Sequence, residues 1–505
     1  MKKNVLWHIL LGVILFLQLA AETLTAVILL RLNMLPEKFA IILIAALFLT
    51  GGLTAFLMYV RFGKPVSTVR RIIACVLALV IVCGCALISK LASDAYETLH
   101  AVTTPTQTTS VRDMYVFVRM DDPAQKLEDT AGYSFGIIED YDTEHTQNLI
   151  HLIGEKTGGI VSVVPFPNVL EMVDGLYSEQ VDALILNGST VSVLIEEEGY
   201  EDFLEKARIL HTIPLTELEV TEPTTEPTTE PSEEKTVTTA PFVVYISGSD
   251  TRSNKLSVSR SDVNILVAVN PLTKQVLLLN TPRDYFIPNP AGNGKLDKLT
   301  HCGNFGVDCS VEALSDLYDL EIDYYAQINF KGFETLIDAV GGVTIYSSQS
   351  FTARSTHIKK GENHLNGSQA LDFARERYNV SGGDNGRGKN QMKVIAALID
   401  KLSSGTTIIS KYSDILASLK GMFKTSMTTE EISSLVKLQL DEMPQWDVHS
   451  FAVTGTGGKE ETYSWPGAKA YVMYPNEKSV EYASKLMDRI LAGEVLTDAD
   501  MKLPE

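Results

Sequence analysis

Three long apolar runs near the N-terminus constrain this chain more than any other feature. They are Val5–Leu30, Phe39–Val60 and Ile72–Leu91. Each reaches the roughly 20 residues that a helix needs to cross the hydrocarbon core of a bilayer. A cleaved signal peptide is the alternative for the first run, but its length and the two runs behind it argue against removal. We therefore expect residues 1–92 to form a membrane region with three transmembrane helices.

Basic residues around these runs predict the orientation of the chain. They are Lys2, Lys3, Arg61, Lys64, Arg70 and Arg71. Because cytoplasmic segments are enriched in Lys and Arg, the N-terminus and the second loop are expected in the cytoplasm. Everything after about residue 92 is then expected outside the cell, in a multi-pass protein of the cell membrane. The formal net charge of -20 also argues against nucleic acid as a partner.

One acid, Glu22, lies inside the first apolar run. An ionisable residue within the membrane is by default a candidate functional group. The simpler interpretation, which we prefer here, places Glu22 near the outer interface, where its carboxylate reaches water.

Residues 101–215 alternate between two kinds of pattern. Strand-like runs occur at Met114–Val118, Tyr133–Ile138, Ile160–Val164, Ala183–Leu186 and Ile209–Ile213, and helix-like runs at Glu144–Lys156, Asn168–Tyr177 and Tyr200–Lys206. This alternation predicts a small α/β domain outside the membrane. It contains no metal cluster, nucleophile motif or phosphate loop, so an accessory or binding role is expected. Residues 216–240 contain TEPTTEPTTEP, which is typical of an extended linker.

Polar side chains follow or precede the strands of a second domain, residues 241–495. The first three strands are predicted at Phe242–Ser247, Val263–Val269 and Val276–Leu279. Asp250, Asp262 and Arg283 lie at the ends of these strands, where α/β folds commonly bind ligands. Two such acids are able to share a hard cation such as magnesium. Taken alone, each is more often a turn or cap residue, and it is their coincidence with arginines that favours a functional site.

Residues 375–391 read RERYNVSGGDNGRGKNQ and form a cationic segment in an acidic chain. Its arginines, its glycine turn and the helix expected directly after Gln391 suit a phosphate or pyrophosphate. If Arg375 and Arg377 lie on extended backbone, their spacing of two points both guanidinium groups to one face. On a helix the two would point in nearly opposite directions. The sequence leaves both conformations open.

Two cysteines of the second domain, Cys302 and Cys309, are close in sequence. An extracellular pair favours a disulfide. On an unbroken helix their α-carbons would be about 10 Å apart, too far for a bridge. Gly303 and Gly306 allow the segment to fold more tightly, so the disulfide stays open.

Residues 242 to about 402 resemble the LytR-CpsA-Psr family of Gram-positive cell-envelope proteins, and its CpsA-type branch in particular. The resemblance is carried by SRSDVNI, TPRD, DKLTH and RERY…GDNGRGKNQ, which occur in this order. Three membrane spans and an accessory domain ahead of the family domain also resemble the CpsA plan. The implied fold is an α/β sheet flanked by helices. Asn390 departs from the many relatives that have arginine there, which puts one phosphate contact in doubt.

The resemblance implies a transferase that moves a glycopolymer from a polyprenyl-pyrophosphate carrier onto peptidoglycan as a phosphodiester. The glycopolymer would be capsular polysaccharide or teichoic acid. Asp250 and Asp262 would hold Mg²⁺ (or Mn²⁺), with Arg283 as the third catalytic residue. The implied pyrophosphate ligands are Arg260, Arg283, Lys298, Arg375, Arg377, Asp384, Arg387 and Gln391. A polyprenyl chain also needs an apolar tunnel, expected between the sheet and the helices at 332–340 and 391–402.

Two other classes of function remain open. In one, water replaces the sugar hydroxyl and the protein is a polyprenyl-pyrophosphate hydrolase. In the other, the protein binds carrier lipid without catalysis, or serves as a scaffold for capsule biosynthesis and export proteins. The intact set of Asp250, Asp262 and arginines argues against the second. The sequence assigns no general base.

Overall fold

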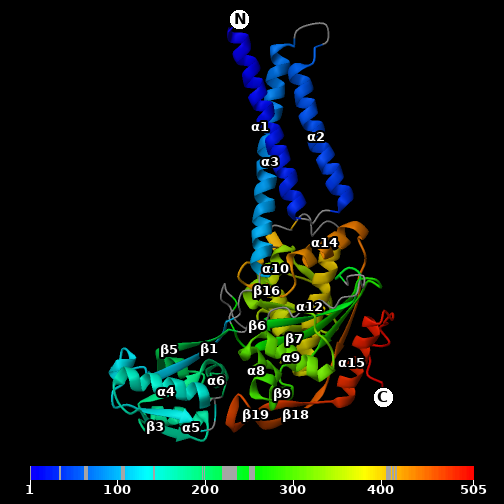
Figure 1. Cartoon of the computed structure of the whole chain (residues 1–505). Helices are drawn as coiled ribbons and strands as arrows, with labels where there is room; N and C mark the ends of the chain where they lie inside the picture. Colours follow the sequence, from blue (N-terminus) through cyan, green and yellow to red (C-terminus); the bar gives the residue numbers. More distant parts are fainter. Residues whose placement is uncertain are drawn as a thin grey trace, which may run out of the picture.

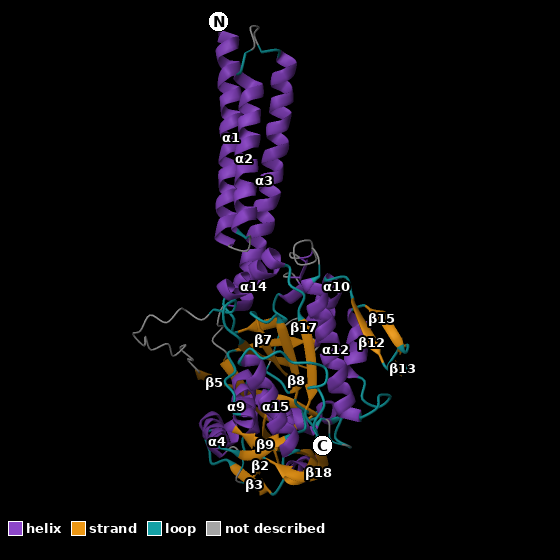
Figure 2. Ribbon diagram, turned by 90° about the vertical axis from the view of Figure 1, so that its right-hand side faces the viewer, coloured by secondary structure: helices purple, strands orange, loops and turns teal. Residues whose placement is uncertain are grey.

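The computed structural model describes most of the 505-residue chain. The described residues are 2–32, 36–61, 66–103, 109–139, 141, 143–195, 197, 199–218, 236–249, 256, 258–404, 411, 414–415 and 418–504. They form a helical stalk and two sheet domains (Figures 1 and 2). The linker predicted at 216–240 lies largely outside the described residues, as does Asp250.

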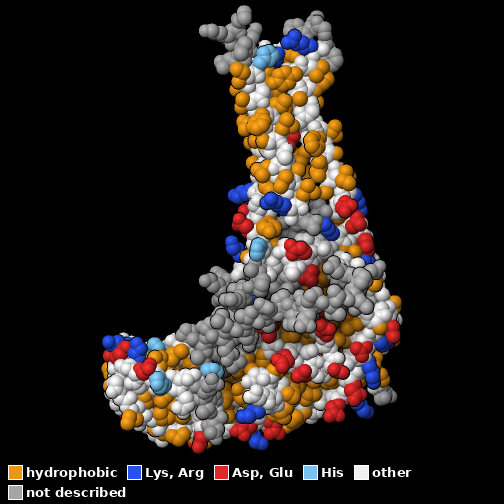
Figure 3. All heavy atoms as spheres, in the orientation of Figure 1, with side chains coloured by type: hydrophobic (Ala, Val, Ile, Leu, Met, Phe, Trp, Pro, Cys, Tyr) orange, Lys and Arg blue, Asp and Glu red, His pale blue; other side chains and the backbone are white. Residues whose placement is uncertain are grey.

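The stalk consists of three helices that correspond to the three predicted apolar runs. They are α1 (Lys2–Leu32), α2 (Glu37–Tyr59) and α3 (Thr68–Thr103), and each is long and apolar enough to cross a membrane. Their outer surface is covered by hydrophobic side chains, whereas charged side chains gather below it (Figure 3). Helix α3 continues beyond Leu91, and its lower end packs on the second sheet domain.

Glu22 lies inside the helical bundle, which differs from our expectation that it reaches water. Its side chain is only 4% exposed. The amide of Gln18 donates to Glu22 Oε1 at 2.8 Å, and the hydroxyl of Thr50 on α2 donates to the same oxygen at 3.0 Å. Gly51 gives the carboxylate its space, since a Cβ there would lie 2.9 Å from Glu22 Oε2. The bond from Thr50 joins two helices, and an interhelical hydrogen bond of this kind stabilises a polar group in an apolar bundle.

Residues 109–218 form the N-terminal sheet domain. Its five strands have the order β3-β2-β4-β1-β5. The strands are β1 (Thr109–Arg119), β2 (Ser134–Ile138), β3 (Ser162–Phe166), β4 (Ala183–Asn187) and β5 (Ala207–Leu218). The helical segments are η1 (Leu127–Thr130), α4 (Thr143–Thr157), α5 (Val169–Tyr177), α6 (Gly188–Leu194) and α7 (Phe203–Lys206). All five predicted strands are present.

Residues 236–504 form the C-terminal sheet domain around six strands in the order β16-β11-β6-β7-β8-β17. These strands are β6 (Phe242–Ser249), β7 (Ser261–Asn270), β8 (Gln275–Asn280), β11 (Tyr324–Asn329), β16 (Phe423–Thr425) and β17 (Asp447–Ala452). Strand β7 is antiparallel to both of its neighbours, whereas β6 and β11 run parallel. The sheet is therefore mixed.

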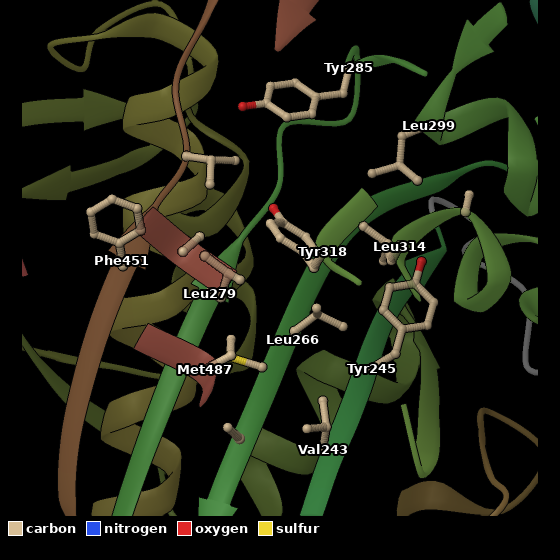
Figure 4. Close-up of a cluster of buried hydrophobic side chains, with 14 of the residues drawn as sticks. Val243, Tyr245, Leu266, Leu279, Tyr285, Leu299, Leu314, Tyr318, Phe451 and Met487 are labelled. Atoms are coloured by element: carbon tan, nitrogen blue, oxygen red, sulfur yellow. The ribbon is translucent and has the colours of Figure 1, made fainter. Parts of the chain in front are cut away.

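Helices cover both faces of this sheet. On one face lie α8 (Leu299–Cys302), α9 (Val307–Tyr318) and α15 (Glu477–Leu491), and on the other α10 (Phe330–Ala339), α11 (Gly367–Arg375) and α12 (Gly383–Ser403). Successive side chains of β7 point to opposite faces of the sheet, and so they pack against both layers of helices. Leu266 joins the core that includes Leu314 and Met487 (Figure 4), whereas Ile265 packs with Met392 of α12. Helix α14 (Thr429–Glu442) lies next to the stalk.

Shorter strands form two-stranded ribbons at the margins of the domain. They are β9 (Phe286–Asn289) with β10 (Lys295–Lys298), β12 (Val343–Ser347) with β15 (Gly361–Leu365), β13 (Phe351–Ala353) with β14 (Thr356–Ile358), and β18 (Gly455–Thr462) with β19 (Trp465–Pro475). The 3-10 turns η2 (Pro290–Gly292) and η3 (Gly303–Phe305) precede α8 and α9, respectively.

The β18–β19 turn joins the two sheet domains. Trp465 is 1% exposed and packs with Phe117, Phe166 and other side chains in a core of the N-terminal sheet domain. The ring of the preceding Tyr463 contacts Tyr141 of the N-terminal domain and Phe305 of the C-terminal one, with centroids 6.0 Å and 5.9 Å away. The two domains thus share a buried contact in addition to the chain between them.

Cys302 and Cys309 are free thiols in this structure, and both are buried. The glycines between them do break the helix, because η3 separates α8 from α9. The Cys309 thiol donates to Asn289 Oδ1 at 3.3 Å. The neighbouring Cys309 and burial raise the pKa of Cys302 well above its ordinary value.

Candidate active site

The ends of neighbouring strands meet at one edge of the main sheet. Ser249, the last residue of β6, pairs with Ser261, the first residue of β7. Asp262 therefore lies at this edge. Asp250 would follow β6 directly, but it lies outside the described residues. Strand β8 ends at Asn280 and delivers Arg283 to the same edge, since the amide of Thr281 still donates to the Asn264 carbonyl oxygen at 2.9 Å.

A chain of ion pairs connects the side chains at this edge. Arg283 Nη1 donates to Asp262 Oδ1 at 2.8 Å. The Nε atom of the same guanidinium lies 3.7 Å from Asp284 Oδ2, and Lys298 Nζ lies 3.5 Å from Asp284 Oδ1. Asp284 was quoted within the TPRD segment but was not among the predicted site residues. It links Arg283 to Lys298.

Helix α12 brings a second acid and a second arginine to the site. The helix begins at Gly383, not after Gln391 as predicted, because Gly382 and Gly383 adopt positive φ and turn the chain into it. Asp384 and Arg387 therefore lie on its first turn, with 2.5 Å between Arg387 Nη2 and Asp384 Oδ1. Polar groups at a helix N-terminus also profit from the free backbone N–H groups there.

A glycine allows α12 to approach the sheet. A Cβ on Gly388 would lie 2.3 Å from Nδ2 of Asn280, at the end of β8. The same approach buries Arg387 and Gln391 beside the strand ends. Of the four glycines in GGDNGRG, Gly382 and Gly383 serve this turn and Gly388 serves this close contact.

Electrostatic coupling perturbs the pKa of each of three site residues. Burial alone would raise the pKa of Asp262, but the charges of Arg283, Arg387 and Arg260 hold it below its ordinary value. Burial raises the pKa of Asp384, and Arg387 compensates only in part. Burial lowers the pKa of Arg387, although a guanidinium stays charged in proteins. The site therefore holds an ionised Asp262 among several cations.

Arg375 and Arg377 lie where a helix gives way to extended backbone. Arg375 is the last residue of α11, and Glu376 has φ -70° and ψ 125°. The Arg375 guanidinium stacks on Phe330, 4.3 Å from its ring centroid, and that of Arg377 on Tyr378 at 4.6 Å. Both arginines line the same cavity. Of the two conformations left open by the sequence, the one that points both toward one site is present.

A cavity of about 650 Å³ opens beside these charged residues. Its polar wall is made by Asp262, Arg283, Arg354, Arg375, Arg377, Arg387 and Gln391. Its apolar wall comes from the sheet, α10, α11 and α12, and includes Ile246, Ile328, Phe333, Leu336, Ile395, Leu398 and Phe423. This location agrees with the predicted apolar tunnel between the sheet and the helices at 332–340 and 391–402.

The structure brings the predicted site residues that it describes into one region. Lys298 and Asp384 reach it through ion pairs, and Arg260 is buried where its charge acts on Asp262. Sequence reasoning missed Arg354, which lines the cavity from the turn between β13 and β14 with a φ of 49°. No motif marks it, because a short hairpin turn lacks hydrophobic periodicity.

A divalent cation fits the chemistry of the described part of the site only through Asp262. An ionised carboxylate in a cavity wall is the type of hard oxygen ligand that Mg²⁺ prefers. Within the described residues, no group of three or more His, Cys, Asp or Glu side chains is arranged to hold a metal. Further ligands would have to come from Asp250, from phosphate oxygens and from water.

Residues 215–485, more than half of the chain, match the LytR_cpsA_psr family. A polyisoprenyl-teichoic acid–peptidoglycan teichoic acid transferase, TagU from Bacillus cereus strain AH820, is 31% identical over 258 residues, which cover 51% of this chain and 82% of the relative. TagU from Enterococcus faecalis strain V583 is 32% identical over 228 residues, which cover 45% and 74%. The solved structure of B. subtilis TagV has 26% identity and a TM-score of 0.42, and the match covers 51% of this chain and 99% of TagV.

Proposed function

This chain belongs to the LytR-CpsA-Psr family, and from that premise we propose that it is a membrane-anchored glycopolymer transferase. The donor is a glycopolymer on a polyprenyl-pyrophosphate carrier, and the acceptor is a sugar hydroxyl of peptidoglycan. The similar TagU proteins are named for transfer of teichoic acid to peptidoglycan. Teichoic acid is therefore the first glycopolymer to test, and capsular polysaccharide, suggested by the resemblance to the CpsA-type branch, is the second.

The observation that carries this proposal is the two-part cavity. One wall presents arginines and the other presents aliphatic and aromatic side chains. A pyrophosphate attached to a long hydrocarbon chain needs both kinds of wall in one cavity. Arginines bind phosphate oxygens through paired N–H donors and stay charged at neutral pH. An inorganic phosphate would have no use for the apolar wall.

Phosphoryl transfer at this site breaks one bond to phosphorus and forms another, and the site arginines bind the donor phosphates. The bond that breaks joins the bridging oxygen of the pyrophosphate to the phosphorus that carries the glycopolymer. The new bond joins this phosphorus to the acceptor oxygen, and polyprenyl phosphate leaves with the bridging oxygen. The proton of the acceptor hydroxyl passes to the leaving phosphate or to water. Arg283, Arg375, Arg377 and Arg387 hold the donor phosphates and neutralise charge that develops on them, which is the main demand of this chemistry.

We propose that Asp262, together with Asp250, holds Mg²⁺ or Mn²⁺ when the donor is bound. The cation would supply charge neutralisation for the departing phosphate. Arg283 keeps Asp262 ionised and fixes its orientation through the contact at 2.8 Å. This second role of Arg283 does not depend on the identity of the metal.

The charge pattern of the membrane region supports an extracellular site. The basic residues near the N-terminus and between α2 and α3 favour the cytoplasm for those ends of the helices. Both sheet domains follow α3 and would then face the wall. This placement brings the acceptor within reach, and leaves the carrier lipid in the adjacent leaflet.

A reconstituted assay tests the proposal. The full chain in phospholipid nanodiscs is mixed with a polyprenyl-pyrophosphate-linked glycan, Mg²⁺ and peptidoglycan fragments. We expect glycan joined to the fragments through a phosphodiester, detected by mass spectrometry, and a loss of product on chelation that added Mg²⁺ restores. Free glycan phosphate without any joined product would instead establish the hydrolase. No turnover of the donor at all would support the binding protein.

A further inference from the structure

The β18–β19 ribbon runs beside the charged cluster, by which we mean Asp262, Arg283, Asp284, Lys298, Asp384 and Arg387. The backbone amide of Met473 in β19 donates to the carbonyl oxygen of Asp284 at 2.7 Å, and Tyr285 and Met473 form a parallel bridge. The ribbon thus holds the segment that carries Arg283 and Asp284. It also lies at the end of the domain that is remote from the membrane stalk (Figures 1 and 2).

One aromatic residue of this ribbon is placed as a platform. Tyr471 lies on β19, two residues before Met473, and its side chain is 47% exposed. Its ring covers Gly457 of β18, since a Cβ there would lie 3.0 Å from Tyr471 Cε2. Burial, and to a lesser extent the negative charges of Asp284 and Asp384, raise the pKa of the Tyr471 phenol. The ring is fixed beside the cluster and remains accessible.

The charged cluster has two sides with different neighbours. Asp262, Arg283 and Arg387 line the apolar cavity, whereas Asp284, Asp384, Lys298 and Tyr471 are not among the residues of its wall. Of the elements that line the cavity, α10 and β16 lie toward the stalk (Figure 1), and they contribute Phe333, Leu336 and Phe423. A polyprenyl chain in the cavity would place the leaving phosphate on the side of the charged cluster that faces the cavity. Attack in line with the leaving group must then come from the opposite side.

We propose that Tyr471 forms the acceptor subsite, where a sugar ring of a wall glycan strand stacks while its hydroxyl reaches the donor phosphorus. The proposal rests on the proposed transferase function and assigns the acceptor's position within it. A sugar ring presents a face of C–H groups, and the flat, negatively charged face of an aromatic ring attracts it. Asp284, whose backbone bonds to Met473 of the same strand, and Asp384, which pairs with Arg387, would accept hydrogen bonds from sugar hydroxyl groups.

The same strand provides a matched control. Tyr474 is also a partly exposed tyrosine, at 38%, and its ring likewise covers a glycine, Gly458. Because side chains alternate along a strand, Tyr474 lies on the opposite face of the ribbon from Tyr471. Its hydroxyl donates to Glu460 and its ring meets Phe286 edge to face.

Glycan binding gives the first test. A hexamer of β-1,4-linked N-acetylglucosamine is titrated onto the full chain in nanodiscs, and its protons are observed by saturation-transfer NMR. We expect Tyr471→Leu to weaken binding about tenfold, the size of a contact worth about 1.4 kcal/mol. Tyr471→Phe keeps the ring and should retain binding, as should Tyr474→Leu. Equal affinity of wild type, Tyr471→Leu and Tyr474→Leu would overturn the proposal.

The transfer assay gives the second test. Tyr471→Leu should raise the KM for peptidoglycan fragments about tenfold while leaving the affinity for the lipid-linked donor unchanged. If transfer proceeds with an unchanged acceptor KM, the subsite is wrong and the transferase function stands. If the wild type binds the hexamer through Tyr471 but joins no glycan to it or to wall fragments, the subsite stands and the transferase function fails.

Discussion

At the scale of single residues, Asp297 shows how a buried charge holds the ends of several segments together. It is fully buried at the end of β10. One oxygen lies 2.6 Å from His301 Nδ1 and accepts from the Lys298 amide at 2.8 Å, and the other accepts from the Ser464 hydroxyl at 2.6 Å. Burial would raise the pKa of Asp297, but His301 and these donors hold it below its ordinary value.

This arrangement predicts a pH-dependent stability. Because the folded pKa of Asp297 is lowered, its contribution is complete above the unfolded value of about 3.9 and is lost as pH falls through the folded value. Asp297→Asn should cost about 3–5 kcal/mol at pH 7, since it leaves His301 without its partner. Urea denaturation at pH 7 and at pH 3 to 4 measures the difference. A gap between the two proteins that stays constant across this range would contradict the argument.

Arg377 is the site arginine whose removal should disturb the fold least. It is exposed, and it stacks on the neighbouring Tyr378, to which it also donates a hydrogen bond. Arg377→Ala should lower transfer by about 10²-fold, the usual effect of losing one donor to developing charge. Its free energy of unfolding should change by no more than about 0.5 kcal/mol, as for other surface substitutions. Lys360→Ala, an exposed cation outside the cavity wall, is the control and should retain activity.

At the scale of elements, Gly303 fixes how closely η3 approaches the start of β7. A Cβ there would lie 2.5 Å from the Ser261 amide nitrogen and 2.6 Å from the Ser259 carbonyl oxygen. Gly303→Ala should therefore displace the segment that carries Asp262, cost about 1–3 kcal/mol by overpacking, and reduce transfer with it. Gly159→Ala meets open space and should leave both unchanged. Thermal unfolding and the transfer assay check the pair, and wild-type activity in Gly303→Ala would refute the prediction.

The sequence predicted those elements that have a strong period and clear punctuation. Hydrophobic alternation placed β6, β7 and β8, and so placed Asp262 and Arg283 at one edge. The start of α12 was missed because Gly382, Gly383, Gly386 and Gly388 look like a loop. Gly388 in particular is needed for the contact with Asn280, a residue about a hundred positions away.

Other parts of the site could not be predicted because they depend on contacts between distant segments. Arg354 reaches the cavity from a hairpin turn without periodicity, and β19, which carries Tyr471, lies beside Asp284 only because Met473 pairs with Tyr285. Glu22 was expected to reach water, since one helix alone does not reveal that Thr50 of α2 supplies a partner. Each case requires the tertiary arrangement.

At the scale of the whole molecule, Trp465 makes the two sheet domains depend on each other. Trp465→Ala should remove about 3–5 kcal/mol of packing, the usual cost of truncating a buried aromatic side chain. The N-terminal sheet domain should then show faster hydrogen exchange at α5, which packs against β19. Trp446 directly precedes β17, and its indole donates to Gln439 of α14. Trp446→Ala is the control and should leave hydrogen exchange at α5 unchanged. Equal exchange in both variants would show that Trp465 does not couple the domains.

Helix α3 also sets the distance between the membrane and the C-terminal sheet domain. The stretch that follows Leu91 runs on to Thr103 as one helix and is about 18 Å long at 1.5 Å per residue. Its end is fastened to the C-terminal sheet domain, because the hydroxyls of Thr103 and Thr429 lie 2.8 Å apart. On the proposed topology, this part of α3 keeps the active site at a constant distance from the lipid surface. The enzyme would then serve the layer of wall strands at that height, and strands laid down farther out would be beyond its range.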